Sequence, residues 1–125
     1  MTFATLDAGA LIAFERADRA MLALVVVARQ EKMKFVAPAP AVAQVWRDGR
    51  RQVRLSRLLA SSLVEVEALT DQRARAAGQL CGITGTRDIV DAAVALCARE
   101  RGGRVITSDP EDISRLDSTL QVIRV

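Results

Sequence analysis

The sequence predicts a single-domain α/β protein, with a parallel sheet covered by helices on both faces. Half of the 125 residues are apolar, which is enough to form one hydrophobic core. Short apolar runs of strand length alternate along the chain with stretches of helical length. No linker, repeat or change of composition divides the chain. This alternation is typical of right-handed βαβ units, which form parallel sheets.

The individual elements follow from apolar runs, breakers and caps. Five apolar runs are predicted as strands: Thr2–Leu6, Lys34–Ala37, Leu63–Val66, Arg104–Thr107 and Leu120–Val125. Seven stretches are predicted as helices: Ala8–Glu15, Ala17–Glu31, Ala41–Asp48, Gly49–Ser61, Thr70–Cys81, Asp88–Arg101 and Asp109–Leu116. Pro38 and Pro40 mark the exit from the second strand, Gly49 is a helix breaker, and Gly82–Gly85 is predicted as a loop.

The composition excludes several kinds of chemistry and indicates a cytoplasmic protein. Histidine and tyrosine are absent, which excludes catalytic triads that use histidine. The two cysteines, Cys81 and Cys97, fall in apolar helical patterns, so we expect buried thiols in a reducing compartment. The longest apolar run, Met21–Ala28, is far shorter than the ~20 residues of a membrane span, and we identify no secretory signal. We therefore expect no membrane partner.

Four aspartates are expected at one edge of the predicted sheet. Asp7 follows the first strand and Asp109 follows the fourth, while Asp88 and Asp91 share the first turn of the helix between them. Ligands of such sheets bind at the carboxyl ends of the strands. At ~5 Å and an effective dielectric constant of ~20, each pair of like charges costs about 3 kcal/mol. Such a cluster must bind a cation or retain protons.

Oxygen ligands without histidine or cysteine select hard ions, so the expected cofactor is Mg²⁺, with Mn²⁺ as the alternative. The chemistry implied is metal-assisted hydrolysis of a phosphodiester. A purely structural interpretation competes with this one. Asp7, Asp88 and Asp109 each stand where a helix cap is expected, with Asp91 completing a capping pair. Three acids at or beside strand ends favour the shared site.

Four separated segments resemble a PIN domain of the VapC toxin type. The segments are Thr5–Asp7, Ala39–Arg47, Asp91–Ala95 and Val105–Asp109. They occur in the family's order, cover essentially the whole chain (residues 1–125), and keep the family's interval between the third and fourth acids. The resemblance implies a PIN-like α/β/α sandwich with the activity of a Mg²⁺-dependent endoribonuclease. It also implies the toxin component of a type II toxin–antitoxin system, usually a homodimer, that acts on RNA and is blocked by a cognate antitoxin.

On the family's pattern, Asp7, Asp91 and Asp109 carry over as catalytic metal ligands, with Asp88 and Thr107 as assisting residues beside them. One position departs from the pattern, because Gln44 stands where the family usually has a glutamate. A glutamine carbonyl coordinates Mg²⁺ without contributing charge, so metal affinity should fall.

Asp48, one helical turn beyond Gln44, is a second candidate for assisting the site. The departure at Gln44 leaves an alternative function open: a catalytically weakened PIN-like module that binds RNA or a protein partner. A phosphoacceptor receiver domain is a third interpretation. It is disfavoured because Glu67 and Ala68, rather than an aspartate, follow the third strand.

Arginines recur every three to four residues after the second strand. They are Arg47, Arg50, Arg51, Arg54 and Arg57. The spacing predicts one arc of a helix that tracks RNA phosphates, docks an acidic partner segment or is simply solvated. Trp46 is predicted to lie in the core with Val42 and Val45. The apolar stretch Met21–Val27 is predicted either as core or as part of a dimer or partner-binding groove.

Overall fold

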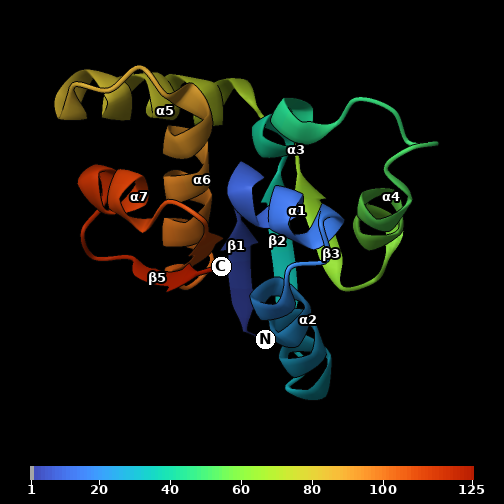
Figure 1. Ribbon diagram of the computed structural model, residues 1–125. Helices are drawn as coiled ribbons and strands as arrows, with labels where there is room; N and C mark the ends of the chain where they lie inside the picture. The colour runs from blue at the N-terminus through green and yellow to red at the C-terminus, as the bar shows by residue number, and fades with distance from the viewer. Residues whose placement is uncertain (1) are drawn as a thin grey trace.

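The computed structural model describes residues 2–125, and Met1 lies outside it. Its sheet has five parallel strands in the order β3-β2-β1-β4-β5 (Figure 1). The strands are β1 (Phe3–Leu6), β2 (Lys34–Pro38), β3 (Val64–Glu67), β4 (Arg104–Thr107) and β5 (Gln121–Arg124). In the central strand, Thr5 pairs with Val36 on one side and with Val105 on the other. The strand order reverses direction between β1 and β4, so a topological switch point lies there.

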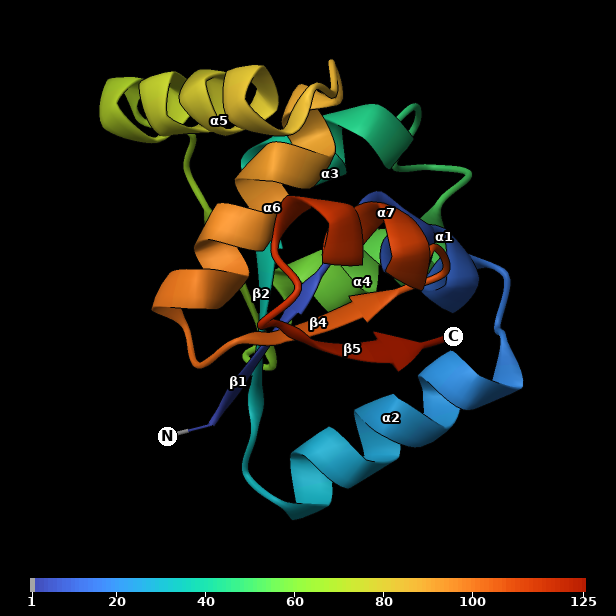
Figure 2. The same ribbon diagram turned by 90° about the vertical axis from the view of Figure 1, so that its left-hand side faces the viewer.

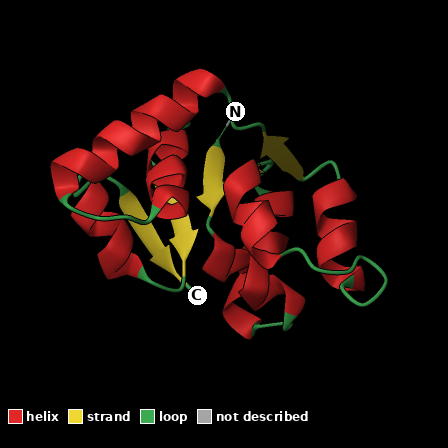
Figure 3. Cartoon of the chain, turned by 90° about the horizontal axis from the view of Figure 1, so that it is seen from above, coloured by secondary structure: helices red, strands yellow, loops and turns green. Residues whose placement is uncertain are grey.

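Seven helices cover the two faces of this sheet. They are α1 (Ala8–Glu15), α2 (Arg19–Gln30), α3 (Ala39–Val45), α4 (Val53–Ala60), α5 (Asp71–Thr84), α6 (Ile89–Glu100) and α7 (Pro110–Leu116). Helices α1, α2 and α4 lie on one side and α5, α6 and α7 on the other (Figures 1 and 2), as right-handed crossovers require. Seen from above, the strands run between these helical layers (Figure 3). The predicted fold class is confirmed.

The core is built around β1 and α6. All residues from Ala92 to Ala98 are buried, because α6 lies between the sheet and the helices α5 and α7. Phe35 and Ile106 are the largest buried side chains of the neighbouring strands β2 and β4. Cys81 and Cys97 are both buried, as expected, and their thiols are free. No helix within residues 2–125 is both long and apolar enough to cross a membrane.

Several element boundaries differ from the prediction. Strand β3 ends one residue later than expected, and α3 begins at Ala39 and ends at Val45 rather than running to Asp48. The predicted loop at Gly82–Gly85 is wrong, because α5 continues to Thr84. Gly82 lies on an exposed helical face, where the missing side chain costs little packing. The helix ends at Gly85, whose φ of 76° is the left-handed conformation that glycine tolerates.

The predicted arginine helix is also wrong. Residues 46–52 form a loop, and α4 starts only at Val53, so Arg47, Arg50 and Arg51 are not helical. Trp46 was expected in the core, but it follows the last residue of α3 in an extended conformation and is 38% exposed. The helical spacing that linked Trp46 to Val42 is lost where α3 ends. On α2, Met21 and Val25 are buried, while Leu22, Val26 and Val27 are exposed.

Candidate metal centre at the carboxyl edge of the sheet

Asp7 and Asp109 lie on either side of the switch point. Asp7 directly follows β1, and Asp109 comes two residues after the end of β4. These strands are neighbours, and the Asp7 backbone N–H continues their pairing by donating to the Ile106 carbonyl at 3.2 Å. The parallel ladder therefore brings two aspartates that are far apart in sequence to the same edge, where ligands of open α/β sheets bind.

Asp7 is a buried carboxylate, with 5% of its surface exposed. Its Oδ1 accepts a hydrogen bond from the Ala10 backbone N–H at 2.8 Å, which makes it the cap of α1. Burial raises the pKa of Asp7, hydrogen bonds from the Thr107 hydroxyl and the Ala10 amide oppose that rise, and the charge of Asp109 adds to it. Thr107 also accepts a hydrogen bond from the Asp109 backbone N–H at 2.8 Å. This hydroxyl therefore connects the two aspartates.

Asp91 is half-buried in the first turn of α6. Its backbone N–H donates to the Asp88 carboxylate at 3.0 Å, so Asp88 is the expected cap of this helix. The pKa of Asp91 is raised to about 7, first by burial and then by the charge of Asp88, by a hydrogen bond shared with Asp88 and by the charge of Asp7. Helix α6 packs against β1 and β4, so its first turn brings Asp91 toward the edge that carries Asp7 and Asp109.

Asp112 is a fifth acid that the sequence analysis did not single out. A hydrogen bond shared with Asp109 and the charge of that residue raise the pKa of Asp112. It lies in the first turn of α7, three residues after Asp109, which is the same step that separates Asp88 from Asp91. That repeated spacing is the signal that could have identified it. We call Asp7, Asp88, Asp91, Asp109 and Asp112 the acidic edge.

A small cavity opens within the acidic edge. Its volume is about 140 Å³ and it is lined by Thr84, Thr86, Asp88, Asp91, Asp112, Arg115 and Leu116. The Arg115 guanidinium pairs with Asp112 at 3.4 Å, but 75% of the Arg115 side chain is exposed, so it neutralises the acids weakly. The cavity is therefore walled by carboxylates whose charge is largely uncompensated.

The donor chemistry of the acidic edge fits a hard divalent cation. All its ligand atoms are carboxylate or hydroxyl oxygens, the type that Mg²⁺ and Mn²⁺ prefer. The pKa values of Asp7 and Asp91 are raised, and the positive charge of a bound cation would lower them again. Within residues 2–125, however, no three acidic side chains lie close enough to form a ready-made metal site. A bound ion would thus require carboxylates to turn toward it.

Gly9 allows the first turn of α1, which follows Asp7, to approach the loop that carries Asp109. A Cβ atom at Gly9 would clash with the Ser108 Oγ and would lie 3.0 Å from the Ser108 Cβ and 3.2 Å from its backbone N. Real side chains do not tolerate such distances, so a larger residue would displace the segment that carries Asp109. The first turn of α1 and the loop after β4 pack closely because position 9 has no side chain.

The remaining predicted site residues come from α3, the loop after it and α4. Gln44 is exposed on α3, a helix that packs against α1 and α6, and within the described residues no hydrogen bond joins it to the acidic edge. Asp48 is not one helical turn further on, because α3 has already ended. Its carboxylate accepts a hydrogen bond from the Arg50 backbone at 3.0 Å and lies 4.0 Å from the Arg51 Nε. The five predicted arginines are exposed along the loop and α4.

Comparisons with known proteins agree with this fold. A search of curated proteins finds no significant match. Among solved structures, the chain is similar to one in the crystal structure of VapBC2 from Rickettsia felis bound to a DNA fragment from their promoter. The two chains are 12% identical, the alignment covers 99% of each, and the TM-score is 0.75, so the similarity concerns the fold. The family model of the PIN domain matches residues 4–118. This protein therefore belongs to the PIN domain family.

Proposed function

We propose that this protein is a Mg²⁺-dependent endoribonuclease, the VapC-type toxin of a type II toxin–antitoxin system. One observation carries the proposal: Asp7 and Asp109 follow the neighbouring strands β1 and β4 and share the Thr107 hydroxyl at the switch point, where an open α/β sheet binds its ligand. We assign Asp7, Asp91 and Asp109 as the residues that hold the ion, with Mn²⁺ as the alternative metal. Membership in the PIN domain family supports nuclease chemistry at this edge.

The chain's own residues have distinct roles in this proposal. Thr107 orients the Asp7 carboxyl group and the Asp109 backbone through its single hydroxyl. Asp88 fixes the first turn of α6, which sets the position of Asp91. Asp91 gives up its proton as the ion binds, so binding strengthens as pH rises through about 7. The ion, once bound, would activate water and neutralise charge on the attacked phosphate.

The partners follow from the fold similarity. The similar rickettsial structure is of VapBC2, and on that basis we propose a cognate antitoxin that blocks the nuclease in the cytoplasm. We also propose a homodimer. The exposed apolar residues Leu22, Val26 and Val27 of α2 offer a surface for such contacts.

A catalytically weakened PIN-like module is the second candidate. The specific observation in its favour is Gln44, an exposed amide where the family's pattern has an acid, together with carboxylates not yet gathered around one point. Such a protein would bind RNA or a protein without cutting RNA.

Cleavage of RNA by the pure protein separates these candidates. We expect cleavage that needs Mg²⁺, stops with EDTA and falls at least ~100-fold in Asp7→Asn, because a bound ion contributes several kcal/mol to the reaction. Asp71→Asn is the matched control, since Asp71 is an exposed aspartate of α5 paired with Arg75. Circular dichroism would verify the fold of both variants. Cleavage that survives EDTA or Asp7→Asn would contradict the proposal, and RNA binding without cleavage would support the weakened module.

A further inference from the structure

The segment Trp46–Arg57, which we call the arginine segment, concentrates positive charge on one part of the surface. It contains five arginines and a single aspartate, more positive charge than the net +3 of the whole chain, so the remainder of the protein is slightly acidic. All five arginines are exposed. A concentrated basic patch on a protein without a general excess of charge indicates a specific anionic ligand.

Most of these arginines have no internal counter-ion. Within residues 2–125, the guanidinium groups of Arg50, Arg54 and Arg57 make no hydrogen bond or ion pair, so they remain available to a ligand. The first turns of α4 bury Leu55 and Leu58, which leaves Arg54 and Arg57 on the exposed side of the helix. The spacing of three residues places the two on one face.

Trp46 adds an aromatic surface to the same segment. It is the only tryptophan of the chain, and 38% of it is exposed. The indole ring lies against Gly49, where a Cβ atom would be 2.9 Å from the Trp46 Cζ2. Glycine at position 49 therefore lets the ring rest on the loop backbone while part of it faces solvent.

Gln52 holds the loop in one conformation. This side chain is 8% exposed, and its Oε1 accepts hydrogen bonds from the backbone N–H groups of Arg47 at 2.7 Å and Asp48 at 2.9 Å. Its Nε2 donates to the Val45 carbonyl at 2.8 Å and to Glu15 at 3.2 Å. The loop is thus tied to the end of α3 and to α1. A ligand need not order it, which lowers the entropic cost of binding.

We propose that the arginine segment binds single-stranded RNA, with Arg50, Arg54 and Arg57 on phosphates and Trp46 stacked on a base. Guanidinium groups suit phosphates, and an exposed indole suits an unpaired base of any sequence. An acidic protein segment would use the arginines but would leave the aromatic surface unexplained, so RNA is the ligand favoured here. The inference rests on the proposed function in taking RNA as the ligand, and it places substrate binding at a surface distinct from the acidic edge.

Binding is measured on the intact protein in EDTA, so that cleavage does not interfere. The probe is a fluorescein-labelled single-stranded oligoribonucleotide of mixed sequence, followed by anisotropy and by quenching of the intrinsic fluorescence. Because Trp46 is the only tryptophan, quenching reports directly on this surface. We expect RNA to quench Trp46, and Trp46→Ala to weaken binding roughly 10-fold.

The double variant Arg50→Ala/Arg54→Ala tests the phosphate contacts. We expect affinity to fall roughly 10-fold or more, and the slope of log affinity against log salt to become shallower by about 1.4, since two phosphate contacts to a single strand are lost. The matched control is Arg19→Ala/Arg29→Ala, which removes the same charge from exposed positions of α2. The control should leave quenching unchanged and affect affinity far less.

Equal effects of the two double variants, or an unquenched Trp46, would overturn this inference. Quenching by polyglutamate or by self-association, but not by RNA, would also overturn it, in favour of a protein ligand. The two proposals fail separately. Cleavage that depends on Asp7 without RNA contacts at the arginine segment would leave only the nuclease proposal standing, whereas RNA bound at this segment but never cut would leave only the present one.

Discussion

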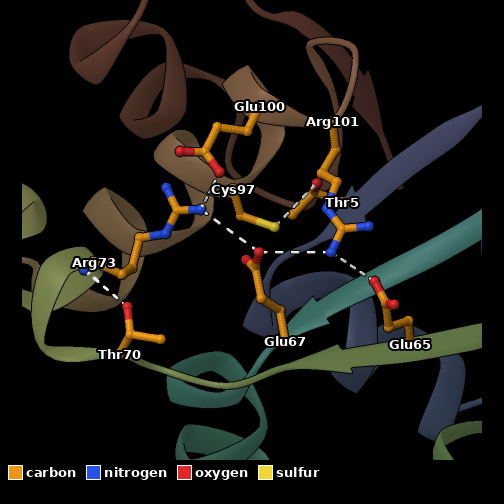
Figure 4. Close-up of polar contacts among 8 residues, drawn as sticks. All are labelled: Thr5, Glu65, Glu67, Thr70, Arg73, Cys97, Glu100 and Arg101. Atoms are coloured by element: carbon orange, nitrogen blue, oxygen red, sulfur yellow. Dashed lines mark hydrogen bonds and ion pairs between the residues drawn. The ribbon is translucent and has the colours of Figure 1, made fainter.

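Two groups of charged residues in this protein are arranged in opposite ways. Beside the edge strand β3, residues of β3, α5 and the end of α6 form the paired cluster: Glu65, Glu67, Arg73, Glu100 and Arg101 (Figure 4). Arg73 lies 2.8 Å from Glu100 and 3.5 Å from Glu67, while Arg101 lies 2.7 Å from Glu65 and 3.6 Å from Glu67. Every acid of this cluster faces a guanidinium group. The acidic edge gathers carboxylates with, among residues 2–125, a single exposed ion-pairing arginine beside them, Arg115.

The pKa values record this difference. Burial alone would lower the pKa of Arg101, yet the charges of Glu65 and Glu67 hold it above its ordinary value. At the acidic edge, burial and neighbouring carboxylates act together and raise the pKa of Asp91 to about 7. The paired cluster therefore satisfies its own charges, whereas the acidic edge keeps a charge imbalance that an external cation can relieve. Unpaired charge is therefore the better indicator of a binding site.

The largest effect is expected from breaking the paired cluster. Arg73→Ala leaves Glu67 and Glu100 without this partner at a position where the arginine side chain is only 13% exposed. We expect the free energy of unfolding to fall by about 2 kcal/mol, because the largely buried Arg73 side chain is lost and Glu67 keeps only the more distant Arg101 as a partner. Urea denaturation measures the change.

Arg75→Ala is the control for that substitution. It removes an arginine two residues further along α5, from a pair with Asp71 in which both side chains are about 80% exposed. Exposed pairs contribute little, so the loss should stay below about 0.5 kcal/mol. If the two variants lose similar amounts of stability, the ion pairs of Arg73 stabilise the fold no more than an exposed pair does.

The acidic edge should instead make the metal-free protein less stable as pH rises. The folded-state pKa of Asp91 lies above its ordinary value, so the folded state binds more protons between about pH 4 and 7. The stability that this group contributes is complete at low pH and lost as pH rises through about 7, by roughly 1–2 kcal/mol after solvent screening. Thermal denaturation against pH measures it.

Two controls accompany the pH experiment. Asp91→Asn should flatten the profile, and added Mg²⁺ should restore stability above pH 7, because the ion occupies the carboxylates that repel one another. If the Asp91→Asn variant keeps the same dependence of stability on pH, Asp91 does not contribute to the charge imbalance.

A smaller effect is expected at Gln44. Gln44→Glu adds the acid that the family's pattern has at this position, and we expect Mg²⁺ to bind roughly 10-fold more tightly by calorimetry, about 1.4 kcal/mol. Gln72→Glu adds the same charge at an exposed position in the first turn of α5 and should change nothing. If Gln44→Glu also leaves affinity unchanged, Gln44 is not part of the metal site.

Most of the fold could be predicted because burial follows directly from the apolar runs. The predicted strand Arg104–Thr107 and helix Ala8–Glu15 match the structure residue for residue. The segment 46–52 could not be predicted, since its arginines keep helical spacing although the chain is not helical there. Gln52 supplies the loop's backbone with hydrogen bonds that a helix would otherwise provide, and a single buried amide leaves no periodic signal in a sequence.

The site was predicted in part. The positions of Asp7 and Asp109 at one edge follow from the ends of parallel strands. The charges of Asp88 and Asp7 act on Asp91, but within residues 2–125 no three of these acids gather around one point. Asp112 was missed because it belongs to the turn after Asp109 rather than to a strand end. The metal-binding role of Asp7, Asp91 and Asp109 stays a prediction, because it depends on how carboxylates turn toward an ion.

The central place of β1 also bears on how the molecule is made. Asp7 leaves the ribosome early, but its neighbours in the acidic edge come from α6 and from the segment after β4, more than eighty residues later along the chain. A nascent or prematurely terminated chain can pair β1 with β2, and β2 with β3, and still lack Asp109 altogether. The charge imbalance is therefore assembled only near the end of synthesis, which delays any activity that depends on it until the polypeptide is almost complete.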